Sequence, residues 1–318
     1  MLATAGSTMQ CGRVLRSVLL TILAAMTLAG CSLKQMAVNT IADSLAEGGG
    51  VYASDDDPEL IREALPFGLK TYESLLQVSP EHRGLLLATA KGFVVYAYFL
   101  KLEADRLEAT DLDRTRQLRA RASRLFLRGR DYALRGLEVG HSGLTAALRQ
   151  DATAALAPAT REDLGLLYWT GAGWAGALSV DKDNADLIAE LPIAAALINR
   201  IIALDETYDR GAAHEFLISY EGSRPGGSAE AARAHYQRAL ELSGGTRAST
   251  YVALAETVAV REQNLAEFRK LLASALAVDP NAVPELRLAN TIAQDRARWL
   301  ETQIPLLFVE SDISGPSS

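Results

Sequence analysis

Cysteine is almost absent from this chain of 318 residues, which contains only Cys11 and Cys31. Cys11 precedes an apolar segment near the start of the chain, and Cys31 follows directly after it. If the chain is cleaved before Cys31, one thiol remains, and a single thiol forms no intramolecular disulfide. The stability of the folded part must then come from packing rather than from cross-links.

Aromatic residues are also scarce, at 6% of the chain, although hydrophobic residues as a whole make up 49%. Alanine and leucine supply most of this apolar content. No segment sustains the alternation of β-branched and polar residues that is typical of strands. These absences exclude a predominantly β fold, and they favour closely packed helices.

Positive charge is in deficit, since 32 Lys and Arg stand against 39 Asp and Glu and leave a net charge of −7. Loss of Arg13 and Arg16 with the segment before Cys31 would make this charge more negative still. Nucleic-acid binding depends mainly on attraction to phosphates. We therefore expect no nucleic-acid partner.

The start of the chain has the features of a bacterial lipoprotein signal peptide. Arg13 and Arg16 form a basic segment, and residues 18–28 form an apolar segment shorter than the roughly 20 residues that span a membrane. The sequence LAGC, which ends at Cys31, resembles the lipobox, in which the cysteine sulfur takes a diacylglyceryl group before cleavage. We predict a signal peptide at residues 1–30 and lipid attachment at Cys31.

This prediction places the protein in the cell envelope, anchored by its lipid and facing the periplasm. Ser32 follows the cysteine where Asp would favour retention in the inner membrane, so the outer membrane is slightly favoured. Residues 31–50 would form an acylated tether. The alternative is an ordinary signal peptide with an incidental Cys31, and Met9 is an alternative start to Met1.

Internal repeats predict the architecture. Four amphipathic segments end in similar turns: GLKTYESLLQVSP, AAALINRIIALDE, ARAHYQRALELSG and FRKLLASALAVDP. The last three end at residues 206, 244 and 280, close to the 34-residue period of tetratricopeptide (TPR) repeats. We predict an all-α, TPR-like solenoid of helical hairpins with irregular repeats over residues 51–306. Residues 111–182 would be an insertion in the array, and residues 307–318 a C-terminal tail.

Motifs for catalysis or metal binding are incomplete. In ASDDDPELIREAL the aspartates are consecutive rather than alternating, so we expect Asp57 to cap a helix that begins at Pro58. HEFLI begins like a zinc-protease helix but has Ile218 at the second histidine position. GHSG, with His141 and Ser142, is one residue short of a nucleophile elbow. We expect no catalytic site, no metal and no cofactor, with a hydrolase using these two residues as the minor alternative.

The four histidines are far apart in the sequence, and we expect them to be structural. They are His82, His141, His214 and His235.

Residues 163–180, DLGLLYWTGAGWAGALSV, combine glycines with large aromatic side chains. Glycines in a helix cost about 1 kcal/mol each relative to alanine, so they indicate close approach of another backbone or of a ligand. One interpretation is a tight helix crossing. The other is the wall of a mostly apolar groove, and its candidate residues are Tyr168, Trp169, Gly171, Gly173 and Trp174.

Several segments together resemble the T component of TPR-associated TRAP transporters, the TatT family. They are DDPELIREALPFGLKTYESLL, LLYWTGAGWAGALS, DRGAAHEFL, HYQRALELSGG with YVALAETVAV, and RLANTIAQDRARWL, and they cover most of the chain from Cys31. The resemblance implies a periplasmic lipoprotein of stacked helix pairs that associates with the solute-binding (P) subunit of a TRAP transporter. It also implies a homotrimer with a pore or groove in each protomer, and capture or hand-over of a small organic molecule, hydrophobic ones included. The alternative is a TPR scaffold lipoprotein for envelope assembly that binds no small molecule.

Overall fold

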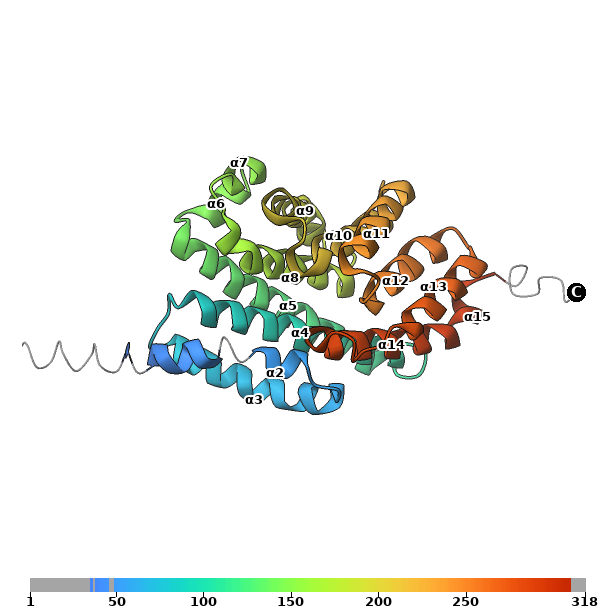
Figure 1. The fold of residues 1–318 in the computed structure, drawn as a ribbon, viewed down its shortest axis with the longest axis horizontal. Helices are drawn as coiled ribbons and strands as arrows, with labels where there is room; N and C mark the ends of the chain where they lie inside the picture. The colour runs from blue at the N-terminus through green and yellow to red at the C-terminus, as the bar shows by residue number, and fades with distance from the viewer. Residues whose placement is uncertain (1–34, 37, 46–48, 310–318) are drawn as a thin grey trace, which may run out of the picture.

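The computed structural model describes residues 35–36, 38–45 and 49–309 (Figure 1). These residues form helices and connecting loops, and no strand occurs among them. The predicted all-α class is therefore confirmed for the described residues. The TPR-like solenoid stays a prediction. Cys31 lies outside the described residues, as does most of the predicted tail.

The helices follow in chain order after a helical segment at residues 38–45. They are α2 Gly49–Ala53, α3 Pro58–Leu76, α4 Arg83–Leu107, α5 Leu112–Gly140, α6 Leu144–Leu148, α7 Ala152–Leu156, α8 Leu164–Val180, α9 Ala185–Asp205, α10 Ala212–Ser223, α11 Ala229–Ser243, α12 Ala248–Leu254, α13 Leu265–Ala277, α14 Arg287–Thr302 and α15 Ile304–Leu307. A π-helical turn, Ala255–Ala259, continues α12.

Local capping chemistry sets the helix starts. The Asp57 side chain accepts hydrogen bonds from the backbone N–H groups of Glu59 and Leu60, both at 3.0 Å, and Pro58 occupies the first helical position. The predicted capping role of Asp57 is thus confirmed. Asp111 and Ser228 cap α5 and α11 in the same way.

Residues 111–182 are not an insertion, which corrects the repeat analysis. α5 packs along α4 over much of its length, and α8 packs on α5. A Cβ at Gly129 would lie 2.9 Å from the carbonyl oxygen of Ala90, so the absence of a side chain allows the close crossing of α4 and α5. The helices of this region therefore build the main core.

Two apolar cores divide the chain, and α10 borders both. The first core is built mainly by α4, α5, α8 and α9, and the second by α11 to α14. Consecutive residues of α10 serve different cores, because Leu217 packs in the first and Ile218 in the second.

The end of the chain returns to its beginning. α14 packs against α12 and α13 and also against α2 and α3 (Figure 1). The Arg287 side chain donates a hydrogen bond to the carbonyl oxygen of Ser54 at 3.0 Å, and Leu288 and Ile292 join a small core with Phe99 and Leu102. As a result, α14 joins the second core to the helices at the start of the described chain.

α4 and α9 are the described helices that are long and apolar enough to cross a membrane. Most of α4 is buried inside the fold, as is usual for the core helix of a globular protein.

Candidate functional site

A row of charged and aromatic side chains lies between the two apolar cores, and we call it the interior seam. It consists of Lys91, Tyr98, Lys101 and Asp105 on α4, Tyr168 and Trp169 on α8, Glu215 on α10, Arg247 directly before α12, Glu256 on the π-helical turn and Arg296 on α14. Charged side chains are rarely buried unless they are paired. The interior seam is therefore the part of the fold whose sequence is hardest to explain by packing alone.

One face of α4 contacts solvent in the middle of the molecule. Lys91 and Tyr98 lie seven residues apart, so they share a helix face. Lys91 is exposed, and 36% of the Tyr98 surface is exposed, although residues 92–94 and 99–100 around them are buried. Burial nevertheless lowers the pKa of Lys91 and raises the pKa of Tyr98 well above its usual value. Neighbouring groups thus partly desolvate Lys91 and Tyr98, and both side chains still contact solvent.

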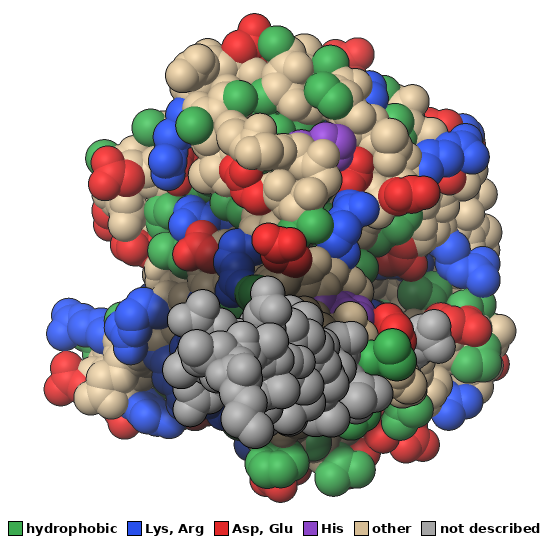
Figure 2. Space-filling view, turned by 90° about the vertical axis from the view of Figure 1, so that its left-hand side faces the viewer, with side chains coloured by type: hydrophobic (Ala, Val, Ile, Leu, Met, Phe, Trp, Pro, Cys, Tyr) green, Lys and Arg blue, Asp and Glu red, His purple; other side chains and the backbone are tan. Residues whose placement is uncertain are grey.

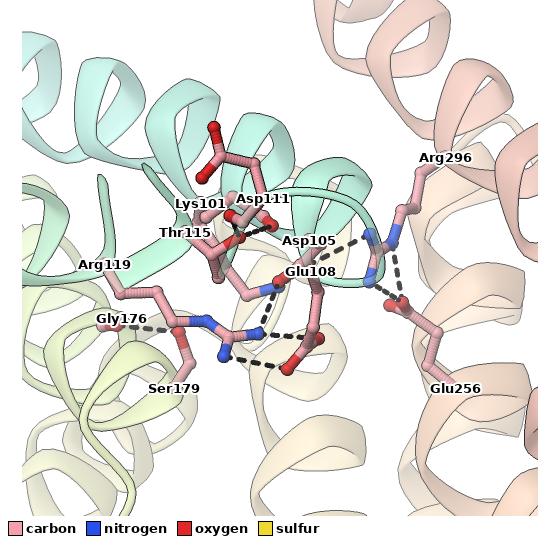
Figure 3. Close-up of polar contacts among 11 residues, drawn as sticks. Lys101, Asp105, Glu108, Asp111, Thr115, Arg119, Gly176, Ser179, Glu256 and Arg296 are labelled. Carbon is pink, nitrogen blue, oxygen red and sulfur yellow. Dashed lines mark hydrogen bonds and ion pairs between the residues drawn. The ribbon is translucent and has the colours of Figure 1, made fainter. Parts of the chain in front are cut away.

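Ion pairs tie the two sides of the interior seam together (Figure 3). The Arg296 guanidinium lies 3.0 Å from Asp105 on α4 and 2.6 Å from Glu256 on the π-helical turn, and it also stacks over Trp299 at 4.1 Å from the ring centre. Lys101 donates to the Asp105 carboxylate at 2.6 Å. Burial works to raise the pKa of Asp105, but Lys101 and Arg296 outweigh it and hold that pKa below its usual value. The carboxylate is therefore ionised, and it anchors α14 to α4.

A second set of ion pairs lies near Tyr168. Arg247, which is 7% exposed, donates to the Glu215 carboxylate and to the Asp209 carbonyl oxygen, both at 3.0 Å. Thr250 also donates to Glu215 at 3.0 Å. Burial raises the pKa of the Tyr168 hydroxyl, and Glu215 adds to this effect. Tyr168 is thus neutral, and it presents an aromatic surface with a polar tip.

Tyr168 and Trp169, two of the predicted groove residues, lie together beside Lys91. Their rings meet edge to face at 5.3 Å, and the Lys91 ammonium lies 6.0 Å from the centre of the Trp169 ring. Both rings are half-buried. Among the described residues, no carboxylate lies within ion-pairing distance of Lys91. A cation beside aromatic faces suits an amphipathic organic molecule.

The other three candidates lie in helix contacts. A Cβ at Gly173 would lie 2.9 Å from the Phe126 carbonyl oxygen on α5, and a Cβ at Gly171 would lie 3.1 Å from Ile198 on α9. Trp174 is 4% exposed, and its indole N–H donates to Glu190 at 2.7 Å. The structure therefore places Gly171, Gly173 and Trp174 in the packing of α8 against α5 and α9.

Sequence reasoning missed most of the interior seam. A signal was present in α4, where Lys91, Tyr98, Lys101 and Asp105 recur at helical spacing on one face. The sequence contains no comparable indication for Glu215, Arg247 and Arg296. Each lies in a separate segment, and the pattern within one segment does not show which other segment it contacts.

His214 and His235, which are distant in the sequence, lie in contact between α10 and α11. Their Nδ1 atoms are 2.9 Å apart, and His214 Nε2 lies 3.1 Å from the Glu206 carboxylate. Because Nε2 of His214 faces a carboxylate, it carries the proton, and Nδ1 of His235 then donates to His214. Both rings are neutral in this arrangement. Protonation of Nδ1 of His214 would remove the acceptor and break the hydrogen bond between the rings.

The histidine pair predicts a loss of stability in mild acid. Burial lowers the pKa of both rings, with Glu206 opposing the shift at His214 and with His214 itself adding to the shift at His235. Folded histidines with lowered pKa bind fewer protons than unfolded ones, so stability is present above the unfolded pKa of about 6.5 and is lost as the pH falls through the folded pKa. Arg238 and His214 hold the pKa of Glu206 at about 2, outside this range. We expect the free energy of unfolding, measured by urea titration, to fall between about pH 7 and pH 5.

His235→Gln should flatten this pH dependence, because one of the two titrating rings is gone. An unchanged slope in the variant would contradict the assignment.

The hydrolase alternative finds no assembled triad in the described residues. His141 Nε2 lies 2.9 Å from the Asp163 carboxylate, which also binds Arg83 and accepts the backbone N–H of Thr160 at 2.8 Å. No hydrogen bond joins Ser142 to His141 in this part of the chain. Asp163 thus has a structural role, because it stabilises the turn directly before α8. Among the residues described, no group of three or more His, Cys, Asp or Glu side chains could hold a metal ion.

Comparisons with known proteins identify the family of this chain. Residues 54–308 match the family described as the TRAP transporter T-component. The chain is also similar to an uncharacterized protein of Treponema pallidum (strain Nichols), with 30% identity over 304 residues that cover 89% of this chain and 94% of the relative. The matched region spans the interior seam from Lys91 to Arg296. The chain therefore belongs to the family of TRAP transporter T-components, which are transport-associated.

Proposed function

We propose that this protein is a lipid-anchored lipoprotein of the cell envelope that works beside a TRAP transporter. In this proposal Cys31 carries the lipid, the body faces the periplasm, and the outer membrane is the preferred location. The protein binds the solute-binding (P) subunit and assists capture or hand-over of a small organic molecule. A homotrimer is part of the same proposal.

The observation that carries the ligand role is the solvent contact of Lys91 and Tyr98 inside the fold. Beside them, the Trp169 ring faces Lys91, and Tyr168 extends the aromatic surface. Ligand sites typically bind the apolar part of a ligand by aromatic rings and orient its polar group by a few charged side chains. Lys91, Tyr168 and Trp169 supply side chains of both kinds. The ligand expected here is amphipathic, with an aromatic or aliphatic body and a polar or acidic end.

A scaffold role in envelope assembly, without a small molecule, is the competing function. It needs helix surfaces for partners, but it does not need a lysine beside two half-buried aromatic rings. The interior seam therefore favours the transport role over the scaffold.

The test is a crosslinking pull-down of the membrane-anchored protein from its own cells, read by mass spectrometry. We expect recovery of an extracytoplasmic solute-binding protein together with TRAP membrane subunits. Recovery of only outer-membrane assembly or cell-wall factors would replace the transport role with the scaffold. An unrelated envelope lipoprotein, crosslinked in parallel, controls for neighbours captured by abundance.

A further inference from the structure

Large exposed apolar side chains gather at the start of the folded part. Five of them are each more than half exposed within residues 36–67: Met36, Ile41, Val51, Leu60 and Phe67. Phe67, at 82%, is the most exposed large hydrophobic side chain of the described residues. Contiguous exposed apolar surface of this kind marks an interaction site, whereas scattered single residues do not.

Two of these side chains, Val51 and Phe67, line an apolar groove. We call the five exposed side chains together with this groove the N-terminal apolar face. The groove lies between residues 44–45, α2 and α3, has a volume of about 490 Å³, and is lined by Val51, Tyr52, Phe67 and Tyr72 among others. Burial raises the pKa of the Tyr72 hydroxyl, with Tyr52 adding to the shift. The lining of the groove is therefore mostly apolar and aromatic, with the hydroxyl of Tyr72 partly desolvated.

The N-terminal apolar face is fixed to the body of the protein. Ala42 is fully buried against Leu76 and Leu86. Ser79 donates to the Asn39 side chain at 2.6 Å, and His82 lies 3.0 Å from Asp43. In Figure 2, hydrophobic side chains appear along the lower edge of this end of the molecule, the edge that α2 and α3 form in Figure 1.

The position of the anchor indicates what covers this face. Residue 35 begins the described chain only four residues after Cys31. Four extended residues span at most about 14 Å, so an acylated Cys31 would hold residue 35 within that distance of the bilayer surface. This step rests on the lipid attachment of the proposed function.

Charge decides how the bilayer would be bound. The surface beside the face is acidic, with Asp56, Asp57 and Glu59 exposed at the start of α3. Attraction to anionic lipid headgroups is therefore not the driving force. The driving force is instead the insertion of apolar side chains among the lipid chains. This insertion gives the anchored protein a second membrane signal besides its acyl chains.

We propose that the N-terminal apolar face lies on the lipid bilayer, with Phe67 and Leu60 inserted at the boundary between headgroups and acyl chains. The face then sets the orientation of the anchored protein, with α3 lying on the membrane.

Brominated lipid tests this contact directly, because bromine on an acyl chain quenches only tryptophan that enters the bilayer. The full acylated chain carrying Phe67→Trp would be reconstituted in phosphatidylcholine vesicles that contain brominated acyl chains. Ile188→Trp, at an exposed apolar position of α9, is the matched control. Both variants keep the three native tryptophans as a common background. We expect the added tryptophan to be quenched several-fold more strongly at position 67 than at position 188.

Other outcomes have distinct meanings. Equal quenching at both positions in the acylated protein would overturn the proposal. Protection of position 67 from both bromolipid and aqueous quencher, with a larger particle mass, would show that a second copy covers the face and would overturn it too. If mass spectrometry finds Cys31 without lipid while added vesicles still quench position 67, the anchor of the proposed function fails but the membrane-facing surface stands.

Discussion

Replacing Arg296 by alanine is expected to lower the free energy of unfolding by about 3 kcal/mol, the lower end of the range for breaking a buried ion pair. Arg296 is 8% exposed, and its guanidinium neutralises Asp105 and Glu256 at once. Without it, Lys101 still pairs with Asp105, but Glu256 loses the arginine that it contacts at 2.6 Å. The substitution therefore weakens two contacts of α14 at once, one with α4 and one with the π-helical turn.

Arg298→Ala is the matched control. Arg298 lies two residues further along α14, its side chain is 58% exposed, and its partner Asp295 is on the same helix. Exposed pairs of this type contribute about 0–1 kcal/mol. Urea unfolding of the two variants should therefore differ clearly. Arg296→Lys should recover only part of the loss, since a single ammonium cannot bridge two carboxylates as the planar guanidinium does. Equal losses at positions 296 and 298 would contradict the structural role of the pair.

Much of the helical content could be predicted, because it depends on local chemistry. Asp57 and Pro58 mark the start of α3 by capping rules that need no tertiary contact. The same reasoning failed for residues 111–182, which do not follow the repeat pattern and were interpreted as an insertion. α5 packs against α4 through Gly129, and a single glycine in an arginine-rich helix does not reveal which helix it meets.

The site was predictable only in part, for a physical reason. Tyr168 and Trp169 stood out because aromatic residues are rare in this chain, and the structure places them on the interior seam. Trp174 stood out for the same reason, but its position on α8 points it to Glu190 and Arg130 instead. Periodicity assigns residues to faces of one helix, whereas the interior seam needs the relative placement of several helices. Arg247 and Arg296 could not be assigned to the interior seam from the sequence, because only the tertiary fold brings their segments next to α4 and α8.

Lys91→Met and Trp169→Ala are each expected to weaken the binding of an amphipathic organic anion by about tenfold, which corresponds to the loss of about 1.4 kcal/mol. Lys91 supplies a cation that no described carboxylate pairs with, and Trp169 supplies the aromatic face beside it. Charge-assisted hydrogen bonds and cation–π contacts are each of this size or larger when desolvated. The measurement is a fluorescence titration with anilinonaphthalene sulfonate, a probe with aromatic rings and one negative charge, on the full chain. Circular dichroism would confirm that the helix content is unchanged.

Three further substitutions decide where the probe binds. Lys70→Met removes an exposed lysine of α3, so it should leave the affinity unchanged. Phe67→Ser should also leave it unchanged, and a loss there would move the probe to the N-terminal apolar face. Trp174→Ala should lower the free energy of unfolding by about 3–5 kcal/mol through the cavity it creates, without a specific loss of affinity in the folded fraction. If Lys91→Met and Trp169→Ala bind as tightly as the unmodified protein, these side chains serve packing alone. A drop at both positions, with the controls intact, would make α4 and α8 the two walls of the ligand site, because Lys91 and Trp169 reach the same space from different helices.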